Sequence, residues 1–197
     1  MELYIIRHGK TDWNATERLQ GREDIELNEK GIAAAIALGK KLQGVHFDKI
    51  YTSPLRRAYQ TAILIKGERN IPIIRDERLA EISFGVNEGT VYSDWIAGGS
   101  SFNAFAHSPE NYVPPKGGES FQSVIERAKD FLKNVIEPDF SSNGRIMVVA
   151  HGVLNAGLTA AIESRPIEKF WASGLFKNCE EKIYTFDGTK WLFGAKT

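Results

Sequence analysis

Cysteine is almost missing from this sequence, because Cys179 is the only one in 197 residues. A single thiol cannot form an internal disulfide, and it cannot supply the clustered thiolates of a cysteine-based metal site. Since secreted proteins often depend on disulfides, this scarcity favours a reducing, cytoplasmic location. The N-terminus also lacks a basic segment followed by a long apolar stretch, so we expect no signal peptide.

An excess of charge of either sign is missing as well. Lys and Arg together number 25, as do Asp and Glu, so the composition favours neither nucleic acid nor an anionic membrane as a partner. No apolar run approaches the length of about 20 residues that a membrane-spanning helix needs. We therefore expect one globular domain, 1–197, with a small molecule as its partner.

Strand-like and helix-like segments alternate along the chain. Strands are expected at 2–7, 47–52, 71–75 and 145–150, and helices at 28–43, 55–66, 120–136 and roughly 153–163. This alternation predicts an α/β fold, a three-layer α/β/α sandwich whose mostly parallel central sheet is covered by helices on both faces. Five side chains of the helices at 28–43 and 55–66 are expected to face the core, namely Ile32, Ile36, Leu38, Leu42 and Ile63.

Two further segments do not follow the alternation. Residues 83–118 are rich in glycine and proline, and we expect them to form a loop-rich cap. Segments 182–186 and 190–193 flank Asp187-Gly188 and predict a hairpin, whose edge could support a homodimer.

Polar clusters follow three of the predicted strands at the point where each strand ends. They are Arg7-His8-Gly9, the segment from Ser53 to Arg57, and His151-Gly152. Parallel sheets bind ligands outside the carboxyl ends of their strands, so the three clusters are expected to form one site. A polar residue where a strand meets water would explain any one cluster alone, but not three at equivalent positions.

The residue types in these clusters favour an anion, and phosphate in particular. Arginine binds phosphate through a planar fork of donors, and the N–H groups near Gly152 at a helix start favour negative charge. A neutral imidazole can attack phosphorus and form a covalent intermediate while arginines neutralise the moving charge. A carboxylic acid such as Glu81 could protonate the leaving oxygen and then activate water.

Several segments match one family's motifs in that family's order. They are Arg7-His8-Gly9-Lys10-Thr11 with Trp13-Asn14, Leu27-Asn28-Glu29-Lys30-Gly31, Thr52 to Ala58 with Thr61, Leu79-Ala80-Glu81-Ile82 with Phe84-Gly85 and Glu88-Gly89, Gly117-Gly118-Glu119-Ser120, and Val148-Val149-Ala150-His151-Gly152. Together they span nearly the whole chain and resemble the histidine phosphatase superfamily, also called phosphoglycerate mutase-like.

The resemblance implies a role for each matching residue. His8 would become the phosphohistidine, and Glu81 would be the proton donor. Arg7, Arg57 and His151 would hold the phosphoryl oxygens, with Asn14, Gln20 and Gly152 as further substrate-binding residues. Arg57 is preferred to Arg56 because the family's phosphate-binding arginine directly precedes the alanine, here Ala58.

The cap favours one branch of the family over another. Between Leu79 and Pro115 there is no Lys or Arg, whereas a mutase must hold a second anionic group of its substrate. The aromatic residues of this segment are Phe84, Tyr92, Trp95, Phe102, Phe105 and Tyr112. They suit a leaving group with an apolar body. We therefore expect a phosphomonoesterase that resembles broad-specificity or α-ribazole phosphatases and acts on a small phosphorylated metabolite.

The sequence also allows other functions for the predicted site. A cofactor-dependent phosphoglycerate mutase could take its cations from Lys10, Arg18, Arg22 and Lys116. A non-catalytic phosphate-binding module would need only the residues that hold the phosphoryl oxygens. Two histidines and a carboxylate could also ligate a metal, but the neighbouring arginines would repel a divalent cation, so we expect neither metal nor cofactor. Taken alone, Asn14 and Gln20 could be ordinary loop residues, and Glu81 a surface carboxylate.

Overall fold

A mixed sheet forms the centre of the computed structural model, which describes residues 1–97, 100–141 and 143–193. The strand order is β3-β2-β4-β1-β5-β6. The strands are β1 (Glu2–Arg7), β2 (Lys49–Thr52), β3 (Ile73–Arg75), β4 (Arg145–Ala150), β5 (Glu181–Phe186) and β6 (Trp191–Phe193). The pairs β1–β4, β4–β2 and β2–β3 are parallel, and the hairpin β5–β6 joins antiparallel to β1.

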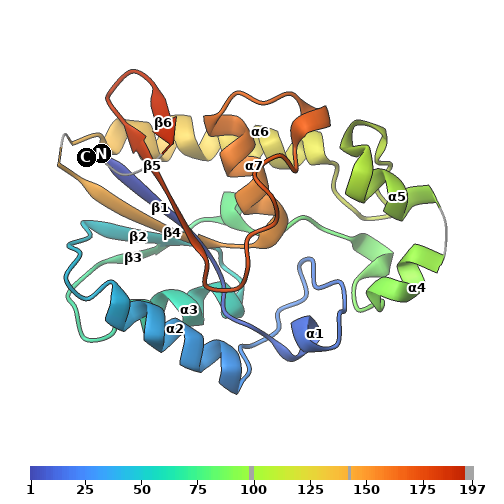
Figure 1. The fold of residues 1–197 in the computed structure, drawn as a ribbon, viewed down its shortest axis with the longest axis horizontal. Coiled ribbons are helices and arrows are strands. Elements are labelled where there is room, and N and C mark those ends of the chain that lie inside the picture. The colour runs from blue at the N-terminus through green and yellow to red at the C-terminus, as the bar shows by residue number, and fades with distance from the viewer. Residues whose placement is uncertain (98–99, 142, 194–197) are drawn as a thin grey trace.

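Helices cover both faces of this sheet, as Figure 1 shows. Helices α2 (Glu29–Lys41) and α3 (Arg56–Lys66) pack together on one face, and α6 (Phe121–Phe131) and α7 (Gly152–Ile162) pack on the other. Alternate residues of β1 point to opposite sides. Tyr4 and Ile6 therefore join the core under α2 and α3, whereas Leu3 and Ile5 join the larger core under α6 and α7. The predicted three-layer sandwich is confirmed.

Helices α2 and α3 bury only part of the predicted apolar set, in which Leu38 and Leu42 are buried as expected. Ile32, Ile36 and Ile63 are each at least two-fifths exposed, so their predicted burial is wrong. Helix α2 instead buries small residues such as Ala35, and an added Cβ at Gly39 would lie only 2.9 Å from the Ile65 carbonyl oxygen of α3. The two helices approach through small side chains, which turns the isoleucines outward.

The cap between residues 83 and 118 contains two short helices that the sequence analysis did not predict, α4 (Tyr92–Ala97) and α5 (Ser100–His107). Its aromatic residues bury one another. The Phe105 ring lies 5.2 Å from Trp95 and 5.3 Å from Tyr112, measured between ring centroids. The side chain of Phe102 lies outside the described part of the structure. Aromatic burial thus orders a segment whose glycines and prolines suggested loops.

The cap lies beyond the carboxyl ends of the parallel strands, next to the short helix α1 (Asp12–Ala15) (Figure 1).

Helix α6 continues into a wider turn over Leu132–Ile136 and a tight turn at Glu137–Asp139. The predicted helix 120–136 is therefore present, with a changed pitch at its end. Within the described residues, no helix has both the length and the apolar character needed to cross a membrane.

Candidate active site

The three polar clusters meet because their strands are neighbours in the sheet. Arg7 pairs with Ala150, and Thr52 pairs with Val149, so the residues that follow these strands reach the same edge. The His8 N–H donates to the Ala150 carbonyl at 2.9 Å, and the Ser53 N–H donates to the Val149 carbonyl at 3.1 Å. The rings of His8 and His151 lie 5.1 Å apart. Parallel pairing thus brings distant parts of the chain into one site.

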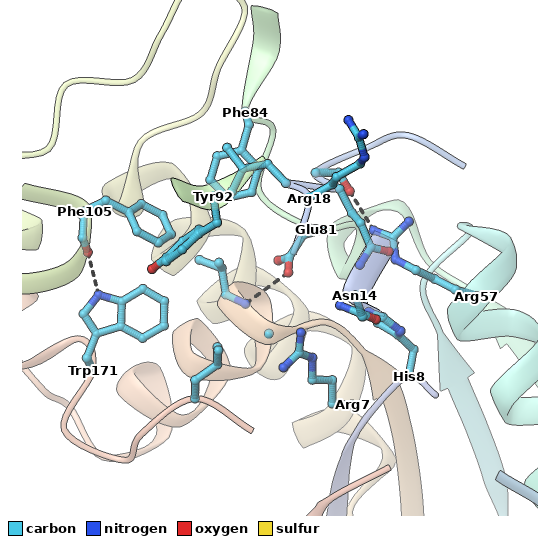
Figure 2. A pocket seen from close by; sticks show the side chains of 16 residues that line it. Arg7, His8, Asn14, Arg18, Arg57, Glu81, Phe84, Tyr92, Phe105 and Trp171 are labelled. Atoms are coloured by element: carbon cyan, nitrogen blue, oxygen red, sulfur yellow. Dashed lines mark hydrogen bonds between the residues drawn. The ribbon is translucent and has the colours of Figure 1, made fainter. Parts of the chain in front are cut away.

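A cavity of about 200 Å³ opens at this edge. Its lining is Arg7, His8, Asn14, Arg18, Leu19, Gln20, Gly21, Arg57, Glu81, Phe84, Tyr92, Phe105, Gly152, Val153, Trp171 and Leu175. Seven of the eight predicted site residues are in this set, and His151 lies behind it, fully buried. Figure 2 shows a polar group around Arg57, Asn14, His8 and Arg7, an aromatic group on the opposite side, and Glu81 between them.

His8 presents a neutral imidazole in a defined tautomer. Its Nδ1 lies 2.7 Å from the Gly9 carbonyl oxygen. A carbonyl can only accept, so Nδ1 carries the proton and Nε2 keeps a free electron pair. Burial, together with the charges of Arg57 and Arg7, holds the pKa of His8 well below its usual range. The geometry and the charges thus both favour the form that can act as a nucleophile.

A close backbone approach holds the turn that follows His8. The Gly9 N–H donates to Thr61 Oγ1 at 2.9 Å, and a Cβ added at Gly9 would lie 2.7 Å from the Gly31 carbonyl oxygen at the start of α2. Any side chain at this position would push α2 away from the site. The Asn178 side chain supports the same turn by donating to the His8 carbonyl at 2.9 Å.

Two buried guanidinium groups flank His8. Arg57 is fully buried and donates to the carbonyls of Gly21 and Glu23, each at 2.7 Å. Arg7 donates to the Phe176 carbonyl at 2.6 Å. Burial lowers the pKa of Arg57 to about 10 and also lowers the pKa of Arg7. Within the described residues, the Nε atom of each arginine is buried without a partner. Unpaired buried cationic donors such as these suit an anionic ligand.

His151 is held by Ser53 behind the cavity. Its Nε2 lies 2.7 Å from Ser53 Oγ, which also accepts the Leu55 N–H at 3.3 Å. When the Ser53 hydroxyl donates its proton to Nε2, the proton of the neutral His151 ring is on Nδ1. This Nδ1 is buried, and no described residue bonds to it. Burial, and next the charge of Arg57, hold the pKa of His151 well below its usual range.

Glu81 is anchored on the first turn of α7. Its Oε2 accepts the Val153 N–H at 3.1 Å, and its Oε1 accepts the N–H groups of Leu154 and Ile82 at 3.0 Å each. The N–H groups of Val153 and Leu154 belong to the free donors at the start of α7, and such donors bind carboxylates well. Because Val153 follows the His151-Gly152 pair, the bonds fix the carboxylate next to the residues that would hold a phosphoryl group.

The predicted binding residues also line the cavity. Asn14 Oδ1 accepts bonds from Thr11 and, at 3.4 Å, from Asn178, so its amide nitrogen is the group left to donate to a ligand. Gln20 is buried, and its Oε1 has no partner within the described residues. Gly152 begins α7, and a Cβ there would lie 3.5 Å from the guanidinium carbon of Arg7.

The aromatic half of the cavity includes residues that the sequence analysis missed. Trp171 and Leu175 come from the segment after α7, and Leu19 comes from the segment after α1. Trp171 Nε1 donates to the Phe105 carbonyl at 2.8 Å and so ties α5 to the segment after α7. Residues 164–180 have no helix or strand periodicity, so no sequence signal placed Trp171 at the site.

The described residues contain no group of three or more His, Cys, Asp or Glu side chains that could hold a metal ion. The charges that lower the pKa of His8 are the guanidinium groups of Arg57 and Arg7, whose positive charge suits an anion rather than a cation. The donor set thus fits a phosphoryl group, with the imidazole of His8 beside it.

Comparisons with known proteins agree with this chemistry. The chain is 32% identical over 186 residues to phosphoserine phosphatase 1 of Hydrogenobacter thermophilus, covering 94% of this chain and 85% of that protein. It is 36% identical over 155 residues to a 2,3-bisphosphoglycerate-dependent phosphoglycerate mutase of a Methylobacterium species, covering 76% and 74%. The solved structure of Bacillus stearothermophilus YhfR matches with a TM-score of 0.90 at 35% identity, covering 99% of this chain and 96% of that one.

A family model described as the histidine phosphatase superfamily, branch 1, matches residues 3–195. This match covers nearly all of the chain, and it contains every residue of the predicted site. Members of the family named above include both phosphatases and mutases. The motifs, the fold and the comparisons together show that the chain belongs to branch 1 of the histidine phosphatase superfamily.

Proposed function

We propose that the protein is a metal-independent phosphomonoesterase that works through a phosphohistidine on His8. The observation that carries the proposal is the neutral His8 ring, with the electron pair of Nε2 free, beside the buried charges of Arg7 and Arg57. A nucleophile next to fixed cations can attack phosphorus while the developing charge on the phosphoryl oxygens is stabilised.

In the first half-reaction, Nε2 of His8 attacks the phosphorus atom and the bond to the ester oxygen breaks. Glu81 in its acid form donates a proton to that oxygen, so that the leaving group departs as an alcohol. The unpaired Nε atoms of Arg7 and Arg57 and the Nδ1–H of His151 are the donors available to the phosphoryl oxygens. Asn14, Gln20 and Gly152 would add further contacts to the substrate.

In the second half-reaction, water attacks the phosphorus of the phosphohistidine. The Glu81 carboxylate takes a proton from the water, the bond from phosphorus to Nε2 breaks, and inorganic phosphate leaves. The bonds that Glu81 makes to Val153 and Leu154 are those of a carboxylate that accepts donors, which is the form needed for this step. His8 returns to its neutral state.

The charges around the cavity favour a phosphatase over a mutase. A phosphoglycerate mutase must hold a carboxylate and a second phosphate besides the phosphoryl group that it transfers. Beyond Arg7 and Arg57, the cation that lines the described cavity is Arg18, and one of its nitrogens already donates to the Gly89 carbonyl at 2.8 Å. The opposite wall consists of Leu19, Phe84, Tyr92, Phe105, Trp171 and Leu175. This wall suits a small phosphorylated metabolite with an apolar body.

A substrate screen tests the proposal. The purified protein is incubated with a panel of aryl phosphates, sugar phosphates, nucleotides, phosphoserine and phosphoglycerates, with and without EDTA. We expect phosphate release that EDTA does not reduce, with a preference for esters of apolar alcohols. Loss of activity in EDTA would contradict metal independence. Isomerisation of 3-phosphoglycerate stimulated by 2,3-bisphosphoglycerate would favour the mutase, and phosphate binding without hydrolysis of any ester would favour a non-catalytic module.

A further inference from the structure

We propose that Glu119 and Arg127 form a positioning pair that holds Glu81 at the cavity, although neither residue lines it. This inference rests on the proposed function, in which Glu81 protonates the leaving oxygen. The two side chains meet through parallel bonds, from Arg127 Nε to Glu119 Oε1 at 2.8 Å and from Arg127 NH2 to Glu119 Oε2 at 3.1 Å. Both side chains are more than four-fifths buried.

The backbone that carries Glu81 has little regular structure of its own. It follows a single tight turn at Glu77–Leu79 and belongs to no strand of the sheet. Arg127 holds this backbone by donating from NH1 to the carbonyl of Arg78 at 2.7 Å and to the carbonyl of Ala80 at 2.6 Å. One guanidinium group thus bonds to the peptide units immediately before Glu81.

Glu119 holds the same segment on the other side of Glu81. Its own N–H donates to the Ser83 carbonyl at 2.9 Å, and the neighbouring Gly118 forms a bridge with Phe84. A closed ring of contacts therefore runs from Ala80 through Arg127 and Glu119 to Ser83, with Glu81 inside it. Arg22 adds to the ring, because its Nε donates to the Glu81 carbonyl at 3.3 Å and its NH2 lies 3.4 Å from Glu119.

The ring also sets where the Glu81 carboxylate stands relative to His8. Arg127 belongs to α6, and α6 packs along α7, whose first turn binds the carboxylate through Val153 and Leu154. The backbone of Glu81 is fixed to one helix and its side chain to the other. Lysine at position 127 would keep the charge, but it could not form the parallel bonds to Glu119 and also bond to two carbonyls.

A displacement of the carboxylate should weaken only the step that needs its proton. Misplacing a catalytic group by about 1 Å costs on the order of 100-fold in rate. A leaving group that is already a stable anion needs no proton, so its departure should be almost insensitive to Glu81. The role of the pair can therefore be separated from general damage by comparing two leaving groups.

The test measures kcat/KM for phenyl phosphate and for 2,4-dinitrophenyl phosphate in the full chain. This constant reports the steps up to transfer of the phosphoryl group to His8, which include protonation of the leaving oxygen. For Arg127→Lys we expect a loss of about 10- to 100-fold with phenyl phosphate and of less than about threefold with the dinitrophenyl ester. For Glu119→Gln, which keeps the carbonyl bonds of Arg127, we expect the same selectivity with a smaller loss.

Arg69→Lys is the matched control, because Arg69 also donates to backbone carbonyls but does so at the far ends of α2 and α3. The ratio of the kcat/KM values of Arg69→Lys for the two esters should equal the ratio for the wild type. Circular dichroism and thermal unfolding check that each variant folds, and Glu119→Gln carries the test if Arg127→Lys does not fold.

Glu81→Gln separates the two ways in which the inference can fail. The positioning role is overturned if Glu81→Gln loses kcat/KM mainly with phenyl phosphate while Arg127→Lys and Glu119→Gln lose kcat/KM equally with both esters or not at all. In that case Glu81 still stands as the proposed acid. If Glu81→Gln loses kcat/KM equally with both esters, Glu81 is not the acid. The positioning role of Glu119 and Arg127 is then excluded as well.

Discussion

The two buried histidines should make the stability of the ligand-free protein fall steeply below neutral pH. Burial, together with neighbouring arginine charge, disfavours the imidazolium form of His8 and of His151 in the folded protein. In the unfolded chain both side chains take up protons near pH 6.5. Below that pH the unfolded state therefore binds more protons than the folded state, and the free energy of unfolding decreases as the pH falls.

The size of the effect follows from the lowered pKa of both groups. For a histidine that stays neutral in the folded state, moving from pH 7 to pH 5.5 costs about 1.3 kcal/mol, so the pair costs about 2.5 kcal/mol. In a chain of this length that loss corresponds to a decrease in Tm of roughly 5–10 °C. Carboxylates add their own pH dependence, and a comparison of variants is needed to remove it.

Urea unfolding at the two pH values, in buffer without phosphate, measures the effect. We expect the double variant His8→Asn/His151→Asn to lose about 2.5 kcal/mol less between pH 7 and pH 5.5 than the wild type does. The exposed His107 provides the control, so His107→Asn should behave as the wild type. Equal losses in the wild type and the double variant would refute the reasoning that both imidazoles are held neutral in the fold.

Three further predictions concern catalysis, the cap and the scaffold. Activity should persist as the pH falls below 6.5, because burial and the charges of Arg57 and Arg7 hold the pKa of His8 well below its usual range and keep the nucleophile neutral. A rate that falls with a midpoint near pH 6.5 would contradict this role of His8. Trp171→Phe keeps a ring but removes the hydrogen bond to the Phe105 carbonyl that ties α5 to the segment after α7. The KM for aryl phosphates should therefore rise about two- to tenfold. An unchanged KM would show that the bond does not hold α5 in place. Arg69→Ala removes donors to the carbonyls of Leu42 and Ile65 at the ends of α2 and α3. It should lower the free energy of unfolding by about 1.5–3 kcal/mol without changing kcat. A loss below about 0.5 kcal/mol in urea unfolding would be inconsistent with that role.

The parts of the site that could be predicted are those fixed by strand ends. Arg7 ends a buried strand, and His8 and His151 directly follow buried strands. Parallel pairing brings such positions together whatever the intervening chain does. The alternation of strands and helices along the chain likewise predicted the three layers of the sandwich. The proposed catalytic set was therefore named from motifs alone. The structure brings four of its five members to one cavity, with His151 behind it.

The parts that could not be predicted depend on contacts between distant segments. Glu81 is held by the start of α7, more than 70 residues later, and nothing near Glu81 in the sequence indicates that bond. Trp171 reaches the cavity from a segment without periodicity. The two cap helices are short, so burial of Trp95 and Phe105 rather than helix propensity determines them. The outward-facing Ile32 shows the same limit, because close packing of α2 on α3 overrides the apolar pattern.

The central claim is that His8 takes up the phosphoryl group during turnover, and trapping that intermediate tests it most directly. The wild-type protein is mixed with a phosphomonoester labelled in its phosphoryl group and denatured in alkali during turnover. We expect labelled wild-type protein whose label survives base and is lost in acid, and no label on His8→Ala. A substrate that is turned over rapidly while wild-type protein acquires no label, or a label that persists in His8→Ala, would contradict the account.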